Sequence, residues 1–432
     1  MSIAGATPTG GTAPPARHPV RLVITDDLNR TRLTVGFRLL LVIPHFVWLG
    51  IWGIGALLAG VANWLATLLT GRSPGVLHRF LGLYVKYATH VYGYFLLGAN
   101  PYPPFDGRPG YPIDLEIDPP APQGRLGVAA RLILVIPALV LAAALFGFPS
   151  TSSNRSGAAF NDSLGLAHAA AFLGWFACIA LGRMPRGLRD SVAWGVGFGA
   201  QLWAYLFMLT SVYPDPDPGV LLGELPRRSD AVGMALRDDG RRSRLTVFFR
   251  LPLTFPHLVW LALWSLLALL AAIANWLATL ATAHPPAVLH RFLSAYVRYQ
   301  AHVYGFLTLT ANPFPGFAGA AGSYDAELEI APPERQSRWS VGFRLLLVLP
   351  AWLLAAAFGS LLWAAAILGW FAALITGRMP RRLRNPAAQA IRYLAQVNAY
   401  LLVLTADYPY GGPCAPAELA APVRTAAELA LG

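Results

Sequence analysis

Four short segments of alternating apolar and polar residues recur along the chain. In the second of them Ile113, Leu115 and Ile117 alternate with acidic residues. A period of two with one apolar face predicts a half-buried β-strand. We therefore expect strands over about 20–24, 113–117, 232–236 and 326–330.

The polar faces of these predicted strands differ in charge. Segments 113–117 and 326–330 are acidic, whereas the other two carry Arg21 and Arg237 at or next to the strand. Opposite charges on facing strands favour mixed pairing. We predict one small four-stranded sheet outside the membrane.

A long apolar stretch and a second helical segment follow each strand. The first stretch, Leu33 to Leu69, has 37 residues and would be ~55 Å long as one helix, against a hydrocarbon core of ~30 Å. It is too long for one simple span. The equivalent stretch of the second copy carries a polar insertion near 149–163, which maps to a break near Trp52-Gly53 in the first copy.

The chain is a fourfold repeat built from two tandem halves offset by 212 residues. Val76-Leu-His-Arg-Phe80 returns as Val288-Leu-His-Arg-Phe292, and an Arg-x5-Arg element opens every quarter. Each quarter also has a Trp, a polar break of the Gly-Arg-x-Pro type and a closing aromatic-Pro pair. The predicted boundaries are a disordered 1–19, repeats at 20–110, 111–219, 220–318 and 319–410, and a tail at 411–432.

Composition makes this a membrane protein. Hydrophobic residues form 56% of the chain and charged ones only 12%, against ~25% charged in globular proteins. We expect an all-α polytopic membrane protein with short extramembrane β-strands. Two spans per repeat, eight in all, keep every strand on one side of the membrane. The alternative of three spans per repeat, twelve in all, would put successive strands on opposite sides.

Net charge is +12, and the arginines flank apolar segments, so anionic lipids rather than nucleic acid are the expected partners. Guanidinium matches phosphate bidentately. The alternative is that these arginines pair with strand carboxylates such as Asp114 and Glu327, or simply anchor the protein at the interface. The candidate headgroup contacts are Arg32, Arg38, Arg125, Arg131, Arg244, Arg250, Arg338 and Arg344.

The second helical segments share a polar face. Aligned by their closing aromatic-Pro pairs, three of the four place a cation one turn before His or Gln, and positions i and i+4 share one face. This face could line a polar path, or the helices could lie at the interface with their basic residues reaching phosphates. The candidate lining residues are Lys86, His90, Gln201, Arg298, His302, Arg392 and Gln396.

The repeated motifs resemble a known family. Phe37–His45, Trp370–Pro380 and Leu402–Pro409 are similar to the bacterial membrane proteins of the domain of unknown function 4389 family. The resemblance covers nearly the whole chain, although the second quarter has its insertion and the third has Ala283-His284 in place of Gly-Arg. It implies an integral multi-pass protein of the bacterial cell (inner) membrane and supplies no catalytic residues.

The sequence carries no motif for catalysis, a cofactor or a metal. No His-Glu-x-x-His, Cys/His cluster or nucleophile elbow occurs, and two cysteines cannot staple a chain of this length. We expect a non-enzymatic protein that binds anionic lipids or partner subunits through its arginines and sheet. The alternative is a channel or transporter for an anionic or amphiphilic solute, lined by the second helices.

Overall fold

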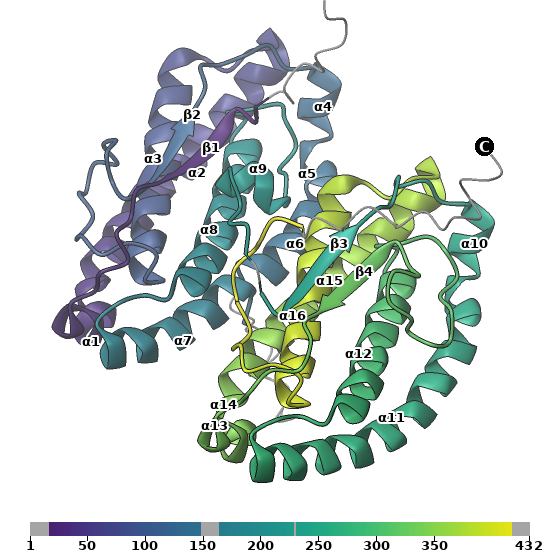
Figure 1. The fold of residues 1–432 in the computed structure, drawn as a ribbon. Coiled ribbons are helices and arrows are strands. Elements are labelled where there is room, and N and C mark those ends of the chain that lie inside the picture. Colours follow the sequence, from purple (N-terminus) through teal and green to yellow (C-terminus); the bar gives the residue numbers. More distant parts are fainter. Residues whose placement is uncertain (1–16, 148–163, 229, 417–432) are drawn as a thin grey trace, which may run out of the picture.

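The structure is a computed structural model that describes residues 17–147, 164–228 and 230–416. It is mostly helical with short antiparallel strands, and its two halves repeat the same order of elements (Figure 1). The predicted polar insertion, nearly all of the predicted disordered N-terminus and most of the C-terminal tail lie outside the described residues.

Each half contains two copies of one unit, consisting of a strand, a long apolar first helix and a second helix. The first half consists of β1 (Val20–Ile24), α1 (Arg32–Leu41), α2 (Ile43–Thr70), α3 (Gly75–Phe95), β2 (Ile113–Ile117), α4 (Arg125–Ala129), α5 (Arg131–Leu134), α6 (Ile136–Leu145), α7 (Leu166–Leu181), α8 (Arg186–Leu206) and α9 (Pro218–Leu222). The second half consists of β3 (Val232–Leu236), α10 (Arg244–Phe248), α11 (Arg250–Thr282), α12 (Ala287–Leu307), β4 (Ala326–Ile330), α13 (Arg338–Gly342), α14 (Arg344–Leu347), α15 (Leu349–Thr376) and α16 (Arg381–Leu401).

The polar breaks form tight tips between first and second helices. Gly71 ends α2 in the left-handed region, at φ 76°, where glycine avoids the Cβ penalty. Pro74 then precedes α3 and fixes the backbone for the next helix start. Ala283 takes the same left-handed conformation at the end of α11, so the third tip carries strain that the glycine tips avoid.

The expected break near Trp52-Gly53 is wrong, because α2 runs unbroken through both residues. Nothing polar or proline-like interrupts the backbone hydrogen bonds there, and an isolated glycine is tolerated within a helix. In the second repeat, by contrast, α6 and α7 are separate helices on either side of the insertion.

The four strands form where the alternation predicts them, but the single four-stranded sheet is wrong. β1 pairs only with β2, and β3 only with β4, as two antiparallel two-stranded sheets. The expected charge pairing holds at Arg21, which lies opposite Glu116 and contacts its carboxylate at 3.1 Å. Each sheet lies on the second helices of its own half, which keeps the two pairs apart (Figure 1).

The sheets run alongside the second helices rather than beyond their ends. Ile113 lies against Gly93 near the end of α3, and Ile117 against Gly82 near its start. The tip after α2 then meets the chain that leaves β2, because Gly71 accepts a hydrogen bond from the amide of Gln123 at 2.8 Å. The tip and the chain that follows the strand are therefore neighbours in the structure.

Three helices in the described residues are long and apolar enough to cross a membrane, which suggests membrane association. They cover Arg32–Thr70, Arg250–Thr282 and Leu349–Thr376. Neither the eight-span nor the twelve-span count is confirmed.

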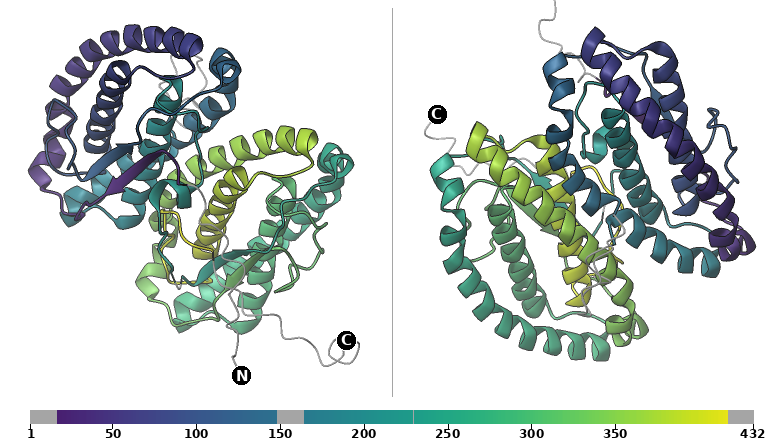
Figure 2. Two further views of the ribbon diagram at one scale, coloured as in Figure 1. Left: turned by 90° about the horizontal axis from the view of Figure 1, so that it is seen from above. Right: turned by 180° about the vertical axis from the view of Figure 1, so that it is seen from behind.

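The halves join through equivalent first helices. α15 packs against α6 and α7, the corresponding helices of the first half, while α2 and α11 lie at the outer sides (Figure 2). Their surfaces differ accordingly, since α2 and α11 expose nearly continuous apolar faces whereas α15 is half buried.

Candidate functional site

The second arginine of each Arg-x5-Arg element is buried. Arg38, Arg131, Arg250 and Arg344 are 1–3% exposed, and each guanidinium lies 4.0–4.3 Å from the ring centre of an aromatic residue near the end of a second helix. They therefore cannot contact lipid headgroups in this structure. They do not pair with strand carboxylates either.

Backbone carbonyls hold these buried arginines. Arg38 donates to the carbonyl oxygens of Tyr94, at 2.7 Å, and Ala99, at 2.9 Å. The carbonyl end of a helix carries partial negative charge, so the C-terminus of α3 takes the place of a carboxylate partner. Arg250 repeats the pattern in the second half with Phe306 and Ala311.

The turn after every second helix is strained at one non-glycine residue. Leu97, Met208, Leu309 and Val403 have φ between 55° and 62°, a left-handed conformation that bulky side chains rarely adopt. A carbonyl group of each turn accepts a hydrogen bond from one long polar side chain. That side chain belongs to the residue two positions before the first arginine of an Arg-x5-Arg element. These side chains belong to Arg30, Gln123, Arg242 and Gln336.

Sequence reasoning missed these four residues. Aligning the repeats at Arg-x5-Arg shows Arg or Gln two residues earlier in all four copies, a signal that could have found them. Arg30 additionally forms a buried pair with Asp26 at 2.8 Å.

The first arginine of each Arg-x5-Arg element is exposed. Arg32, Arg244 and Arg338 donate to carbonyls at the ends of α7, α15 and α11 respectively. Each of the four is followed directly by a strongly exposed apolar residue; the four residues are Leu33, Leu126, Leu245 and Trp339. The exposed arginines thus lie at the border of the apolar surface, where headgroup contact is geometrically possible.

The polar face of α3 is covered by β2. His90 is fully buried, and its Nε2 lies 2.9 Å from Oδ1 of Asp114. Burial alone would raise the pKa of the Asp114 carboxyl, but hydrogen bonds from His90 and two backbone amides outweigh it and lower that pKa. Lys86 is half-buried on the same helix.

The second half repeats this cluster with longer side chains. Glu327 of β4 is 2% exposed and lies 3.6 Å from His302 and 4.0 Å from Arg298, both on α12. Burial would raise the pKa of Glu327, whereas the His302 contact and backbone amides lower it overall. A histidine on the helix and a carboxylate on the strand therefore fasten the sheet to its helix in both halves, and in the second half Arg298 adds a cation to this contact.

The remaining candidate lining residues also bind strands and connections. Gln201 donates to the carbonyl of Val20 in β1, and Gln396 donates to that of Val232 in β3, both at 3.0 Å. Arg392 is 4% exposed and donates to Gln389 and to the carbonyl of Gly412. None of these side chains is aimed into an open path.

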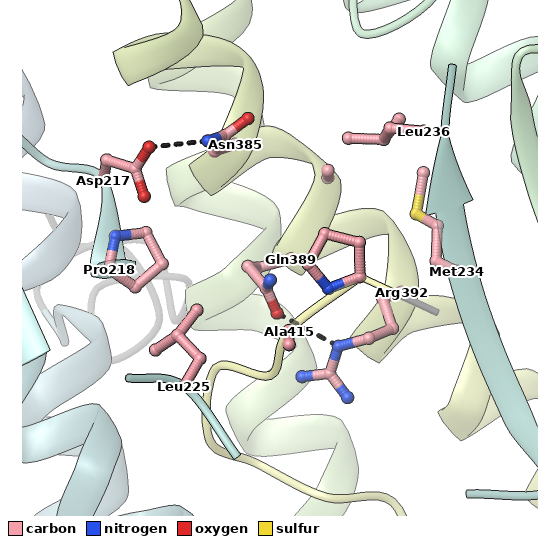
Figure 3. A pocket seen from close by; sticks show the side chains of 11 residues that line it. Asp217, Pro218, Leu225, Met234, Leu236, Asn385, Gln389, Arg392 and Ala415 are labelled. Atoms are coloured by element: carbon pink, nitrogen blue, oxygen red, sulfur yellow. Dashed lines mark hydrogen bonds between the residues drawn. The ribbon is translucent and has the colours of Figure 1, made fainter. Parts of the chain in front are cut away.

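Arg392 does border a small cavity between the halves, lined also by Asp217, Asn385 and Met234 (Figure 3). Its volume is about 60 Å³, room for about two water molecules.

Within the described residues, no group of three or more His, Cys, Asp or Glu side chains could hold a metal ion. The seven candidate lining residues lie on two pairs of second helices, α3 with α8 and α12 with α16, and do not surround one axis.

The four repeated tryptophans connect the repeats of each half. Trp64 donates from its indole to the carbonyl of Val128 at 3.0 Å, and Trp276 to that of Val341 at 2.8 Å. Trp175 donates in the same way to the carbonyl of Val35, and Trp370 to that of Val247, each in the other repeat of its half. This arrangement locks each first helix to the Arg-x5-Arg element of the neighbouring repeat.

Comparison with known families agrees with the repeat. The model of the family described as "Domain of unknown function (DUF4389)" matches residues 32–106, 244–318 and 338–412. The second repeat, which carries the insertion, is not among these matches. No curated protein and no solved structure matches the chain.

Proposed function

Since this chain belongs to the DUF4389 family, whose description assigns no activity, we propose a function from the geometry. The protein is a non-enzymatic component of the bacterial cell membrane that rests its first helices in the lipid and binds anionic lipids at the border of that surface. Its sheets face water, where they are available to partner subunits.

The distribution of charge on the surface carries this proposal. No charged residue occurs between Arg38 and Arg72 or between Arg250 and Arg291, and α2 and α11 expose large apolar side chains along their whole lengths. Apolar exposure on this scale marks a membrane or protein contact. The second helices, by contrast, expose few large apolar residues.

The position of the sheets favours an in-plane arrangement over simple spanning. Glu116 and Asp118 have side chains that are 60% and 45% exposed, and β2 lies alongside α3. If α3 crossed the bilayer in contact with lipid, these carboxylates would lie within the hydrocarbon, which is costly. Apolar first helices lying in one leaflet, with the sheets in water, avoid that cost.

The position of the exposed arginines supports headgroup contacts at this border. Arg32, Arg125, Arg244 and Arg338 lie next to apolar residues that would enter the leaflet. Each basic residue near an anionic membrane surface contributes about 1 kcal/mol to the binding free energy. Four together therefore raise the partition of the protein onto the membrane by about a thousandfold.

Lipid retention tests the proposal directly. The full-length protein is extracted gently from its native membrane, and bound lipids and proteins are quantified by mass spectrometry. We expect retained anionic phospholipid in the wild type, and its loss in a variant with Gln at the four exposed arginines. A control variant, Arg21→Gln with Arg237→Gln, removes charges in or next to the strands of the two sheets, away from the first helices.

The outcomes separate the alternatives. Equal lipid retention by the fourfold variant and the wild type overturns the headgroup role. If a stoichiometric protein stays bound to the wild type and to the fourfold variant, and no lipid is retained, the function is partner assembly through the sheets. Labelling of cysteines introduced at Ser73 and Thr25 from opposite membrane sides overturns the in-plane arrangement.

A further inference from the structure

We propose that the first half holds a lipid-binding pocket, in which a cavity between its two second helices takes the acyl chain of a membrane phospholipid. The cavity measures about 270 Å³, nearly twice the ~150 Å³ that holds a benzene molecule. It is lined mainly by apolar side chains and contains no charged residue. Its contributors include Leu49 of α2, Ala88 of α3, Phe146 at the end of α6, and Gly199 and Trp203 of α8.

The pocket lies on the side of the second helices that faces away from the sheet. On α3 the sheet contacts Gly82 and His90, whereas Tyr84, Ala88 and Tyr92 line the cavity. Leu49 of α2 and Ala142 of α6 line the cavity as well. Trp203 at its edge is 49% exposed, so the cavity is continuous with the apolar surface.

This continuity identifies the occupant. A cavity lined by carbon atoms and reached from an apolar surface is filled more favourably by hydrocarbon than by water. Because the surrounding surface lies in lipid under the proposed function, on which this inference rests, the available hydrocarbon is a phospholipid acyl chain.

The second half provides an internal comparison, because its equivalent positions carry larger or polar side chains. Ala88 corresponds to Gln300, Gly199 to Leu394 and Trp203 to Asn398. There, Asn398 donates a hydrogen bond to Gln300 at 2.7 Å across the two second helices. The duplication has thus kept a cavity in one half and placed a polar bridge and a leucine in the other.

Gly199 is the position at which the pocket can be closed. A Cβ atom there would meet only Phe146 Cδ2, at 3.9 Å, so a side chain fits without moving the backbone and extends into the cavity. Glycine is also a weak helix former. Gly199→Leu should therefore fill the pocket without lowering the unfolding temperature.

The experiment uses the full-length protein in vesicles that contain phosphatidylglycerol with a diazirine in one acyl chain. After illumination, cross-linked peptides are mapped by mass spectrometry. In the wild type we expect adducts on the cavity-lining parts of α3 and α8, and few on the equivalent parts of α12 and α16. Gly199→Leu should reduce the α3 and α8 adducts at least about tenfold, because each methylene excluded weakens burial about fourfold.

A reciprocal variant tests the same idea in the second half. Leu394→Gly with Gln300→Ala should create new adducts on α12 and α16. Adducts on the exposed faces of α2 and α11 report the membrane contact itself, and they should be the same in every variant. Their absence would refute the proposed function, independently of the pocket.

Three results overturn the pocket while leaving the membrane contact intact. The first is equal labelling of the second helices in both halves of the wild type. The second is unchanged labelling of α3 and α8 in Gly199→Leu. The third is a set of wild-type adducts confined to the exposed faces of α2 and α11, with none on α3 or α8.

Discussion

Replacing the buried arginine Arg38 by methionine tests whether the end of a second helix acts as its counter-charge. Methionine keeps much of the volume and removes the guanidinium. The three bonds that it loses run to the carbonyls of Tyr94 and Ala99 and, at 3.3 Å, to the side chain of Asn100. The packing of Arg38 over the Tyr94 ring is lost as well.

The two short bonds set the magnitude. Hydrogen bonds to a charged group contribute about 1.5–3 kcal/mol each, so about 3–6 kcal/mol is lost before other effects. Removing a buried charge returns part of its desolvation cost, which leaves a net loss of about 3 kcal/mol. For a unit of roughly 200 residues, 1 kcal/mol corresponds to about 2–4 °C in melting temperature. We therefore expect Arg38→Met to melt roughly 6–12 °C below the wild type.

Thermal unfolding in one detergent, followed by tryptophan fluorescence and by loss of the monodisperse peak in size exclusion, measures the change. Arg32→Met is the matched control, because Arg32 lies on the same helix, is exposed and makes one bond, to Ala180. It should change stability by less than about 0.5 kcal/mol. If Arg38→Met has the same melting temperature as the control, the carbonyl end of α3 does not stabilise the charge and our reasoning fails.

Three further predictions concern the contacts between repeats. Trp276→Phe removes the indole bond to the neighbouring repeat and should cost about 1 kcal/mol in thermal unfolding. Asp114→Asn should lower the melting temperature at pH 7, because the folded state holds the Asp114 pKa below its unfolded value. This contribution is present above about pH 4 and is lost as pH falls through the folded pKa, so the two proteins should converge as the solution becomes more acidic. Gly319→Ala should destabilise strongly, since its φ is 57° and a Cβ would collide with the carbonyl of Ala295.

Different results would contradict each of the three. An unchanged melting temperature in Trp276→Phe would show that the carbonyl of Val341 finds another donor. A gap between Asp114→Asn and the wild type that widens as pH falls would reverse the assigned sign of the Asp114 shift. Wild-type expression and melting in Gly319→Ala would show that the loop after α12 relaxes freely.

The sequence predicts local structure well where period and repetition agree. The alternation at Ile113, Leu115 and Ile117 marks strand β2 at its observed bounds, because side-chain period depends only on neighbouring residues. Which strands pair depends on how the two halves pack. The halves pack through the contact of α15 with α6 and α7. Charge complementarity predicted that the strand with Arg21 pairs with an acidic strand, but it could not exclude a larger sheet.

The candidate site was harder to predict because its partners are backbone groups. Arg38 and Arg32 have the same residue type and similar apolar neighbours, yet one is buried and the other exposed. Their difference arises from carbonyls near Tyr94, some 56 residues away, which no residue type reveals. Likewise, the polar face of α3 was recognised, but its covering strand was not, since His90 and Asp114 are joined only by tertiary packing.

The exchange of contacts between neighbouring repeats dictates an order of assembly during synthesis. Arg21 of β1 meets Glu116 across 95 residues of chain, which a ribosome adds in about 5–20 s at 5–20 residues per second. Throughout that delay β1 is an unpaired edge strand beside a freshly made apolar helix, a state prone to misassociation. Neither repeat of a half can complete its sheet alone, so the smallest unit able to do so on the ribosome is the pair.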